Sequence, residues 1–377
     1  MGYVKAAKVL VKARMPSPTP PFTSFAPGEL WPDNNGVHIN AHGGGILLHD
    51  GIFHWFGEHK VAGKAGNVAM VGVSCYTSRD LYNWSDAGIA LAVSDEPASD
   101  LVRGCVIERP KVIYNPRTRR FVMWFHLELK GQGYAAARVG VAESERAIGP
   151  YRFLRSFRPN AGDWPLNVPE EQKRPLDEGE TAAMARLPFT GASFPAYPGT
   201  FRRDVAGGQM SRDMTLFVDD DGAAYHVRSS EENGTLHIAL LSDDFLGTAG
   251  PYVRVLPGRF NEGPALFKRA GRYYLIASDC TGWAPNAARS AVADSIWGPW
   301  SELGNPCEGS AEQVATTFAS QSTYVLKLPD RADAYIYLGD RWRPDDARDG
   351  RYVWLPLRFD DGRPRLAWRE RWDLSVF

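Results

Sequence analysis

A hairpin motif that recurs five times constrains this chain more than any other feature of its sequence. Each copy has a short apolar run, a polar or glycine-containing corner and an aromatic-rich run, which is typical of two antiparallel strands joined by a turn. The five copies are GGGILLHDGIFHWFG (43–57), RPKVIYNPRTRRFVMWFH (109–126), DMTLFVDDDGAAYHVRSS (213–230), GPALFKRAGRYYLIAS (263–278) and QSTYVLKLPDRADAYIYLGD (321–340). Self-similarity at a spacing of tens of residues indicates a repeat architecture.

A third alternating strand follows most of the hairpins. It reads VGVSCYTSRD, ARVGVAESE, LHIALLSDD and AARSAVADS, and each copy precedes a turn with an aromatic residue, at 83–84 and in the Gly-Pro-aromatic triplets at 149, 250 and 298. Four antiparallel strands per unit, repeated at roughly 45 to 65 residues, predict an all-β, five-bladed β-propeller in which each blade covers its neighbour's apolar face. A β-sandwich with repeated hairpins is the alternative, but it does not explain the recurring aromatic corner.

Two segments do not fit the repeat. Residues 1–27, which include PSPTPP, are expected to form an extended leader before a single propeller domain that spans 28–377. The stretch at about 158–208 is rich in proline, glycine and charge, and we expect this insert to lie over a face of the propeller, where it could shape a pocket. No apolar run approaches the roughly 20 residues of a membrane span, so no membrane partner is predicted.

Composition excludes several other classes of function. The net charge is -1 and the basic residues are scattered, so nucleic acid is not an expected partner. The four cysteines form no CxxC pair and the eight histidines no HExxH pattern, so no catalytic metal or cofactor is predicted, although one or two disulfides remain possible. The DDDG sequence at 219–222 lacks the rest of a calcium loop and is interpreted as a hairpin turn.

Polar residues stand at the start of the first strand of every blade. These strands line the central channel of a propeller, so the residues converge although they are far apart in sequence; they are His42, Glu108, Asp213, Glu262 and Gln321. Three carboxylates and an amide at one place suit cleavage of a glycosidic bond, which needs a proton for the leaving oxygen and an activated water. Crowded acids raise one another's proton affinity, which favours an acid catalyst near neutral pH. His42, beside the three glycines, is assigned to substrate binding, with a packing role in the channel as the equal alternative.

Aromatic side chains are the second element of a sugar site, because flat rings stack on the C–H faces of sugars. Trp55, Tyr134, Trp283 and Trp342 lie in or beside first-strand and loop segments. A place in the blade core is the default expectation for each. Trp283, in the loop sequence CTGWAPN, is the one we assign to substrate.

The motifs resemble those of glycoside hydrolase family 43, and more closely its exo-β-1,3-galactanase branch. The resemblance spans residues 40–376 and is carried by INAHGGGIL, FHWFGE, ERPKVIYN, SRDMTLFVDDDG, NEGPALFK, TGWAPN, SQSTYVL and GDRWRP. It implies a five-bladed propeller and an inverting hydrolase in which Glu262 is the general acid. Asp213 would then tune the pKa and the orientation of this acid. Relatives are often secreted or periplasmic, and some hold a structural calcium ion, which we do not predict here.

The resemblance leaves the third catalytic role open. Most of the family carries an aspartate on the first blade as general base, whereas this chain has NAHGG there. In the galactanase branch a glutamine that matches Gln321 positions the water, with a glutamate that matches Glu108 nearby. Either Gln321 acts through an unusual tautomer or Glu108 takes the proton. By the same matching, the residues that would contact the sugar are Glu58, Tyr134, Thr281 and Trp283.

The predicted activity is exo-acting release of terminal galactose from β-1,3-galactan chains such as those of arabinogalactan. The insert at 158–208 resembles that of bacterial relatives whose substrates include arabinofuranosides and galactofuranosides. An α-L-arabinofuranosidase or a β-galactofuranosidase is therefore a second interpretation. A carbohydrate-binding propeller without activity is a third, but three converging carboxylates repel one another, and a binding module does not need them.

Overall fold

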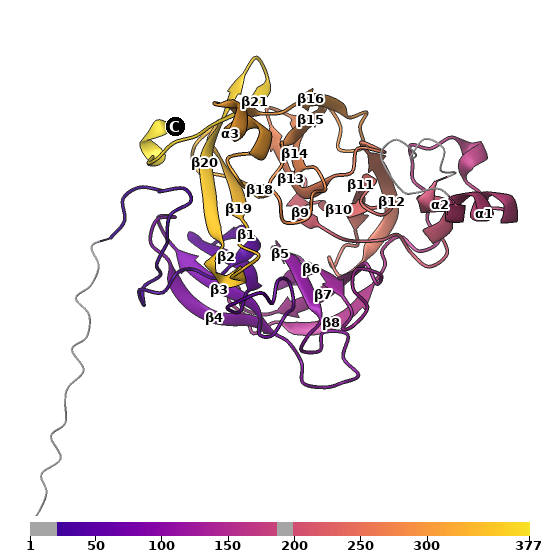
Figure 1. Ribbon diagram of the computed structural model, residues 1–377, viewed down its shortest axis with the longest axis horizontal. Helices are drawn as coiled ribbons and strands as arrows, with labels where there is room; N and C mark the ends of the chain where they lie inside the picture. Colours follow the sequence, from indigo (N-terminus) through magenta and orange to yellow (C-terminus); the bar gives the residue numbers. More distant parts are fainter. Residues whose placement is uncertain (1–20, 187–198) are drawn as a thin grey trace, which may run out of the picture.

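The computed structural model describes residues 21–186 and 199–377, whose strands form five small sheets around a central axis (Figure 1). Each of the first four blades has four antiparallel strands in sequence order. They are β1 (His42–His49), β2 (Ile52–His59), β3 (Gly72–Ser78) and β4 (Ser85–Ala92); β5 (Val106–Asn115), β6 (Arg120–Glu128), β7 (Arg138–Ser144) and β8 (Arg152–Phe157); β9 (Met214–Val218), β10 (Ala224–Ser230), β11 (Thr235–Leu241) and β12 (Thr248–Val255); β13 (Glu262–Arg269), β14 (Arg272–Ser278), β15 (Arg289–Ala293) and β16 (Ser301–Gly304).

The fifth blade has one strand more. It contains β18 (Gln321–Lys327), β19 (Tyr335–Arg341), β20 (Arg351–Asp360) and β21 (Arg363–Ala367), and the two-residue strand β17 (Cys307–Glu308) pairs in parallel with β21. Helix α3 (Ala311–Thr316), which begins with a capping box formed by Ser310 and Gln313, connects β17 to β18. The prediction of an all-β, five-bladed propeller with four antiparallel strands per blade is confirmed, with this short parallel strand as an addition.

The apolar core of the described chain is divided among the interfaces between blades. Five clusters of buried side chains each combine residues from two adjacent blades. The cluster between the first and last blades is rich in tryptophan and contains Trp55, Trp84, Trp354 and Trp372. Trp55 therefore belongs to the blade core, which was the default expectation. Each blade covers its neighbour because a four-stranded sheet cannot bury its own faces alone.

The turns follow the sequence signals with one exception. The DDDG segment forms the hairpin between β9 and β10, where the amide of Asp219 donates to the carbonyl of Ala223. The Gly-Pro-aromatic triplets at 149 and 298 lie between third and fourth strands. The prediction of a turn at 250 is wrong, because Gly250-Pro251-Tyr252 lies inside β12. The turn is made earlier by Asp244, whose side chain accepts from the Leu246 amide, and Pro251 is tolerated on an outer strand.

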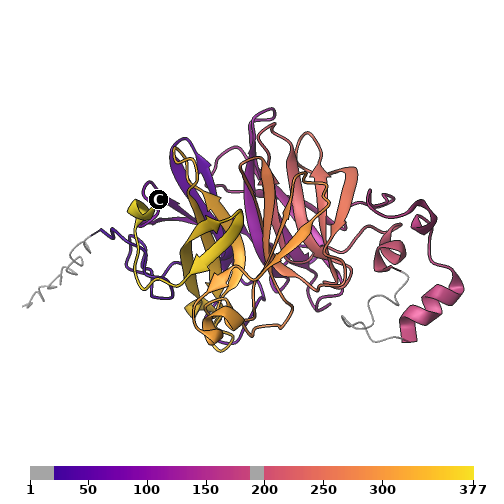
Figure 2. The same cartoon turned by 90° about the horizontal axis from the view of Figure 1, so that it is seen from above.

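The N-terminal segment and the insert lie in other positions than the sequence predicts. Phe25, inside the predicted leader 1–27, is buried, and its amide donates to the Trp372 carbonyl (2.8 Å), so the folded body takes in the end of that segment; residues 1–20 lie outside the described ones. The described part of the insert contains η1 (Glu170–Gln172), α1 (Glu178–Arg186) and α2 (Thr200–Asp204). It lies beside the outer strand β12, not over the channel (Figures 1 and 2), and residues 187–198 lie outside the described ones.

Backbone bonding explains the lateral position of the insert. The Leu166 amide donates to the Tyr252 carbonyl (2.8 Å), and the side chain of Asn167 bonds both backbone groups of Arg254 (2.7 and 3.0 Å). The insert thus begins by covering the outer edge of the third blade, which would otherwise expose unpaired backbone groups.

The four cysteines are all free. Among the described residues, the helices are too short or too polar to span a membrane.

Candidate active site

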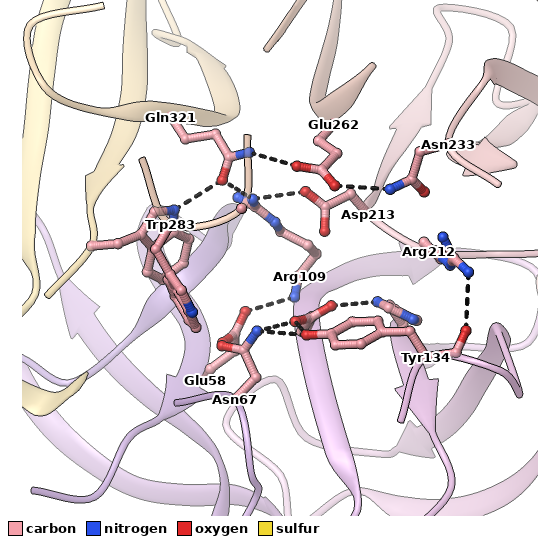
Figure 3. Close-up of a pocket in the computed structure, with 14 residues that line it drawn as sticks. Glu58, Asn67, Arg109, Tyr134, Arg212, Asp213, Asn233, Glu262, Trp283 and Gln321 are labelled. Atoms are coloured by element: carbon pink, nitrogen blue, oxygen red, sulfur yellow. Dashed lines mark hydrogen bonds and ion pairs between the residues drawn. The ribbon is translucent and has the colours of Figure 1, made fainter. Parts of the chain in front are cut away.

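A cavity of about 300 Å³ lies at the end of the channel where the first strands of the blades begin (Figure 3). Residues from all five blades line it: Glu58, Asn67, Glu108, Arg109, His126, Tyr134, Arg212, Asp213, Asn233, Glu262, Gly282, Trp283, Gln321 and Trp342. The predicted catalytic residues Glu262, Asp213, Gln321 and Glu108 are therefore brought together, as are Glu58, Tyr134 and Trp283 from the predicted sugar contacts.

Two predicted substrate contacts do not line this cavity. His42 is fully buried, and its ring packs on that of Tyr352 at 5.3 Å between centroids, so it is a packing residue of the channel. The Thr281 hydroxyl donates to the Ala284 carbonyl (2.6 Å) and thereby orders the loop that carries Trp283. We correct the assignment of His42, which is buried behind the cavity wall. Thr281 is exposed beside Gly282 of the cavity lining, and its contact with the sugar stays a prediction.

A β-bulge lies near the start of three inner strands, after His42 in β1, Glu108 in β5 and Glu262 in β13, and in β5 and β13 it follows a residue that lines the cavity. The pairing registers shift between His42 and Gly45, between Glu108 and Lys111, and between Glu262 and Ala265. A bulge adds one residue, so side chains that would alternate across a regular strand can point the same way. This is how the adjacent residues Glu108 and Arg109 both reach the cavity.

The residue after each of these site positions has a left-handed backbone. The φ angles are 60° at Gly43, 55° at Arg109 and 57° at Gly263. In this conformation the Arg109 amide donates to Glu58 Oε1 and the Gly263 amide to Asp213 Oδ2, both at 2.9 Å. A β-carbon at Gly43 would overlap the Glu58 carboxylate, and side chains rarely adopt its φ of 60°, so both the space and the backbone favour glycine here.

Three of the four carboxylates that line the cavity each contact a cation. The pairs are Asp213 with Arg109 (2.8 Å), Glu58 with Lys60 (2.5 Å) and Glu108 with His126 (2.5 Å). Glu262 forms no ion pair with any residue of the described chain. Its Oε1 accepts from the Asn233 amide nitrogen (2.8 Å) and its Oε2 lies 3.5 Å from that of Gln321.

This pairing separates the proton affinities of the carboxylates. Burial, reinforced by the negative charge of Asp213, raises the pKa of Glu262 from 4.5 to about 8. Burial also opposes ionisation of Glu108, but the charge and hydrogen bond of His126 and the hydroxyl of Tyr134 (2.6 Å) bring its pKa to about 2. The site therefore holds a protonated Glu262 and an ionised Glu108 at neutral pH.

The hydrogen bonds of Gln321 fix the orientation of its amide. Its Oε1 accepts from Arg109 Nη2 (2.5 Å) and from Trp342 Nε1 (2.9 Å), and its Nε2 donates to the Ser278 hydroxyl (2.9 Å). Both groups that face Oε1 can only donate. A proton on this oxygen would have no acceptor there, so the arrangement disfavours an imidic acid tautomer.

A metal ion would compete with bonds that are already made. Oxygen or nitrogen atoms of Glu108, His126 and Asp213 lie within 4.8 Å of one another. Asp213, however, is paired with Arg109, and the two ring nitrogens of His126 contact Glu108 and Glu128. Burial opposes protonation of His126, but these two glutamates raise its pKa to about 9. A cationic imidazolium donates from both nitrogens and has no lone pair for a metal.

Several functional residues were missed by reasoning from the sequence. Arg109, Asn67, Arg212 and Asn233 were not selected, and the last three lie in loops that carry no periodic signal. His126 could have been found, because the hairpin register places it directly opposite Glu108.

Comparisons with known proteins agree with this architecture. A family model for glycosyl hydrolases family 43 matches residues 193–364. A solved family 43 β-1,3-galactosidase with galactodeoxynojirimycin is 51% identical over 93% of this chain and 100% of that chain, with a TM-score of 0.87. The chain belongs to glycosyl hydrolase family 43. The resemblance found in the sequence motifs is thereby confirmed.

Two further relatives differ in their activities. The exo-β-1,3-galactanase of Phanerochaete chrysosporium, solved with β-1,3-galactotriose, is 32% identical over 94% of this chain and 69% of that chain, with a TM-score of 0.74. The curated β-D-galactofuranosidase of Aspergillus niger is 30% identical over 146 residues, which is 38% of this chain and 41% of that protein. The chain thus matches less than half the length of this curated relative.

Proposed function

We propose that this protein is an inverting, exo-acting glycoside hydrolase that releases terminal galactose from β-1,3-galactan chains. The observation that carries the proposal is the pairing of charges: Glu262 is the one cavity carboxylate without a cation among the described residues, and it holds its proton at neutral pH. A cavity of about 300 Å³ is at the small end of ligand pockets and suits one terminal sugar. The 51% identical β-1,3-galactosidase, solved with galactodeoxynojirimycin, supports galactose as this sugar.

Glu262 is the general acid in this proposal. It donates its proton to the leaving oxygen as the glycosidic bond breaks, and the carboxylate that forms is stabilised by the Asn233 N–H that already points at Oε1. Asp213 acts through Glu262, because its negative charge favours the protonated acid. Arg109 and the Gly263 amide hold Asp213 in place.

The water that attacks the sugar needs a proton acceptor on the opposite side of the ring from the acid. Because the hydrogen bonds of Gln321 disfavour its imidic acid tautomer, we assign Gln321 to orienting the water and Glu108 to accepting its proton. Azide tests this assignment. It should restore turnover of a nitrophenyl β-galactoside by Glu108→Gln and give the α-galactosyl azide, whereas rescue of Gln321→Ala alone would move the base to Gln321.

Trp283 provides the apolar surface of the site. It lies on a loop after β14, is 39% exposed, and meets Trp342 edge to face with ring centroids 5.8 Å apart. An exposed ring at the mouth of a polar cavity suits stacking on a sugar C–H face. Trp342 is held by its bond to Gln321, so the pair joins the apolar and polar sides of the pocket.

Product analysis tests the proposed function. Wild-type protein should release galactose, and no longer product at early times, from β-1,3-galactan and arabinogalactan, with the α-anomer appearing first by proton NMR. Glu262→Gln should lose this activity about a thousandfold, which lies within the range of general-acid catalysis. The exposed Glu96→Gln serves as the matched control and should behave as wild type.

The Aspergillus niger relative makes furanosidase activity the second candidate. A panel of nitrophenyl glycosides separates the two activities. Turnover of the β-galactofuranoside or the α-L-arabinofuranoside alone would overturn the galactanase proposal. Saturable galactan binding without any turnover would favour a carbohydrate-binding propeller.

A further inference from the structure

A strained turn carries Asn233 to the acid. Glu231, Glu232 and Asn233 are three consecutive non-glycine residues with φ angles of 53°, 57° and 66°. Each such left-handed residue is unfavourable by itself and persists only where the surroundings hold it. The Asn233 Oδ1 is buried without a partner in the described chain, so the donation to Glu262 is the one hydrogen bond found for this side chain, while its backbone carbonyl accepts from the Asn261 amide (3.0 Å). The position of Asn233 therefore depends on what anchors the turn.

The first anchor is the buried carboxylate of Glu231. It accepts from His237 Nε2 (2.9 Å), from Arg254 Nε and Nη2 (2.6 and 2.9 Å) and from the Thr200 hydroxyl (3.1 Å). His237 and Arg254 belong to the third blade, whereas Thr200 is the first residue of α2 in the insert. The guanidinium of Arg254 also lies over the ring of Phe201, 4.5 Å from its centroid, so α2 packs on the same group.

The second anchor is the carboxylate of Glu232. It accepts from Arg203 of α2 (3.2 Å) and from Arg212 (2.9 Å), which also donates to the Tyr134 carbonyl (3.0 Å). The insert therefore touches both carboxylates of the turn. Figure 1 shows α2 beside the third blade and away from the channel, so α2 reaches the cavity through its contacts with this turn.

We propose that α2 of the insert is a positioning element for the acid: it holds the turn at 231–233 so that Asn233 points at Glu262. This inference rests on the proposed role of Glu262. Asn233 is the positioning residue through which α2 acts. Because its N–H stabilises the carboxylate that Glu262 becomes, losing the contact should raise the pKa of Glu262 and slow proton transfer to the leaving group.

A double-mutant cycle tests the inference with Thr200→Val/Arg203→Gln on the insert side and Asn233→Ala on the acid side. We expect Asn233→Ala to lower kcat about tenfold and the insert-side variant about fivefold, on whichever glycoside the wild type cleaves, since each removes hydrogen bonds of ordinary strength. Both should move the basic limb of the kcat/KM profile to higher pH. In the Asn233→Ala background the insert-side changes should have no further effect on kcat. Lys173→Gln, which removes an insert ion pair that does not touch the turn, is the control.

A titration without turnover keeps this test separate from the proposed function. The carboxyl band of Glu262, isolated by infrared difference against Glu262→Gln, should titrate at higher pH in both variants, and the two shifts should not add. If the wild type cleaves no glycoside, the proposed function fails and this titration still decides the positioning role. An insert-side variant that lowers the Tm but leaves the Glu262 titration unchanged, or that lowers kcat by the same factor in both backgrounds, would overturn the inference.

Discussion

Replacement of Glu262 by glutamine should stabilise the protein by an amount that grows with pH. The substitution keeps the shape of the side chain and removes its ionisation. In the folded protein, burial and the charge of Asp213 raise the pKa of Glu262 from 4.5 to about 8. Between these values the folded state holds a proton that the unfolded chain has released, so the free energy of unfolding of the wild type falls as pH rises.

The two pKa values set the size of this effect. Each pH unit between them costs about 1.4 kcal/mol, so the limiting destabilisation is about 3 kcal/mol at pH 7 and about 5 kcal/mol above pH 8. Glu262 is partly exposed, so solvent screens part of this cost, and we therefore expect a measured difference of about 2 kcal/mol at pH 7. Below pH 4.5 the ionisation contributes nothing, and only the constant difference between glutamate and glutamine remains.

Urea unfolding of the wild type and Glu262→Gln at pH 5, 6, 7 and 8 measures the difference directly. The free energy of unfolding of Glu262→Gln minus that of the wild type should increase steadily across this range. It should be larger at pH 8 than at pH 5. The Glu96→Gln control should show a constant difference. A constant difference for Glu262→Gln would refute the argument, because it would mean that Glu262 ionises in the folded protein as it does in the unfolded chain.

Three further substitutions probe two side chains of the cavity and one buried lysine of β5. Tyr134→Phe removes a 2.6 Å hydrogen bond to the ionised Glu108, so the pKa of Glu108 should rise and the acidic limb of kcat/KM should move to higher pH; an unchanged limb would contradict the role given to Glu108. Trp283→Ala should raise KM about tenfold with little change in kcat, since the ring binds sugar and makes no contact with the acid; a loss confined to kcat would count against stacking. Lys111 is buried, and burial lowers its pKa from 10.5 to about 7. Between these pH values the unfolded chain holds a proton that the folded protein has released, so the free energy of unfolding of the wild type rises with pH. The stability of Lys111→Met relative to wild type should therefore fall between pH 7 and pH 10 in urea titrations, and a relative stability that rises instead would refute this.

The blades could be predicted from the sequence because hairpins are local. An apolar run, a polar corner and a second apolar run specify adjacent strands through turn chemistry and alternation alone. The parallel strand at Cys307–Glu308 could not be predicted, since two residues carry no period and their partner lies near Leu366, far along the chain. The predicted position of the insert was wrong for a related reason. Its hydrogen bonds to Tyr252 and Arg254 join segments that are far apart in the sequence.

Convergence of the site could be predicted because the closed ring of blades brings the starts of the first strands together. The direction of each side chain could not be predicted, since it depends on the bulges. His42 and Glu108 occupy equivalent places in their strands, yet His42 turns into the wall, and Glu58, its partner across the hairpin, reaches the cavity in its place. Arg109 would point away from Glu108 in a regular strand, and its φ of 55° turns it toward Asp213.

The cations paired with the cavity carboxylates decide which carboxylate is the acid. Four carboxylates in one small cavity would repel one another, and the chain offsets three of them with Arg109, Lys60 and His126. The fourth can stay in the same space only by keeping its proton, since an unpaired buried charge is unfavourable by several kcal/mol. Glu262 thus becomes an acid because no residue of the described chain pairs it with a cation, while Asn233 offers a neutral N–H that stabilises the carboxylate formed when the proton leaves. The sequence could identify the carboxylates, but the assignment of the proton depends on cations that the bulges and the neighbouring blades bring into place.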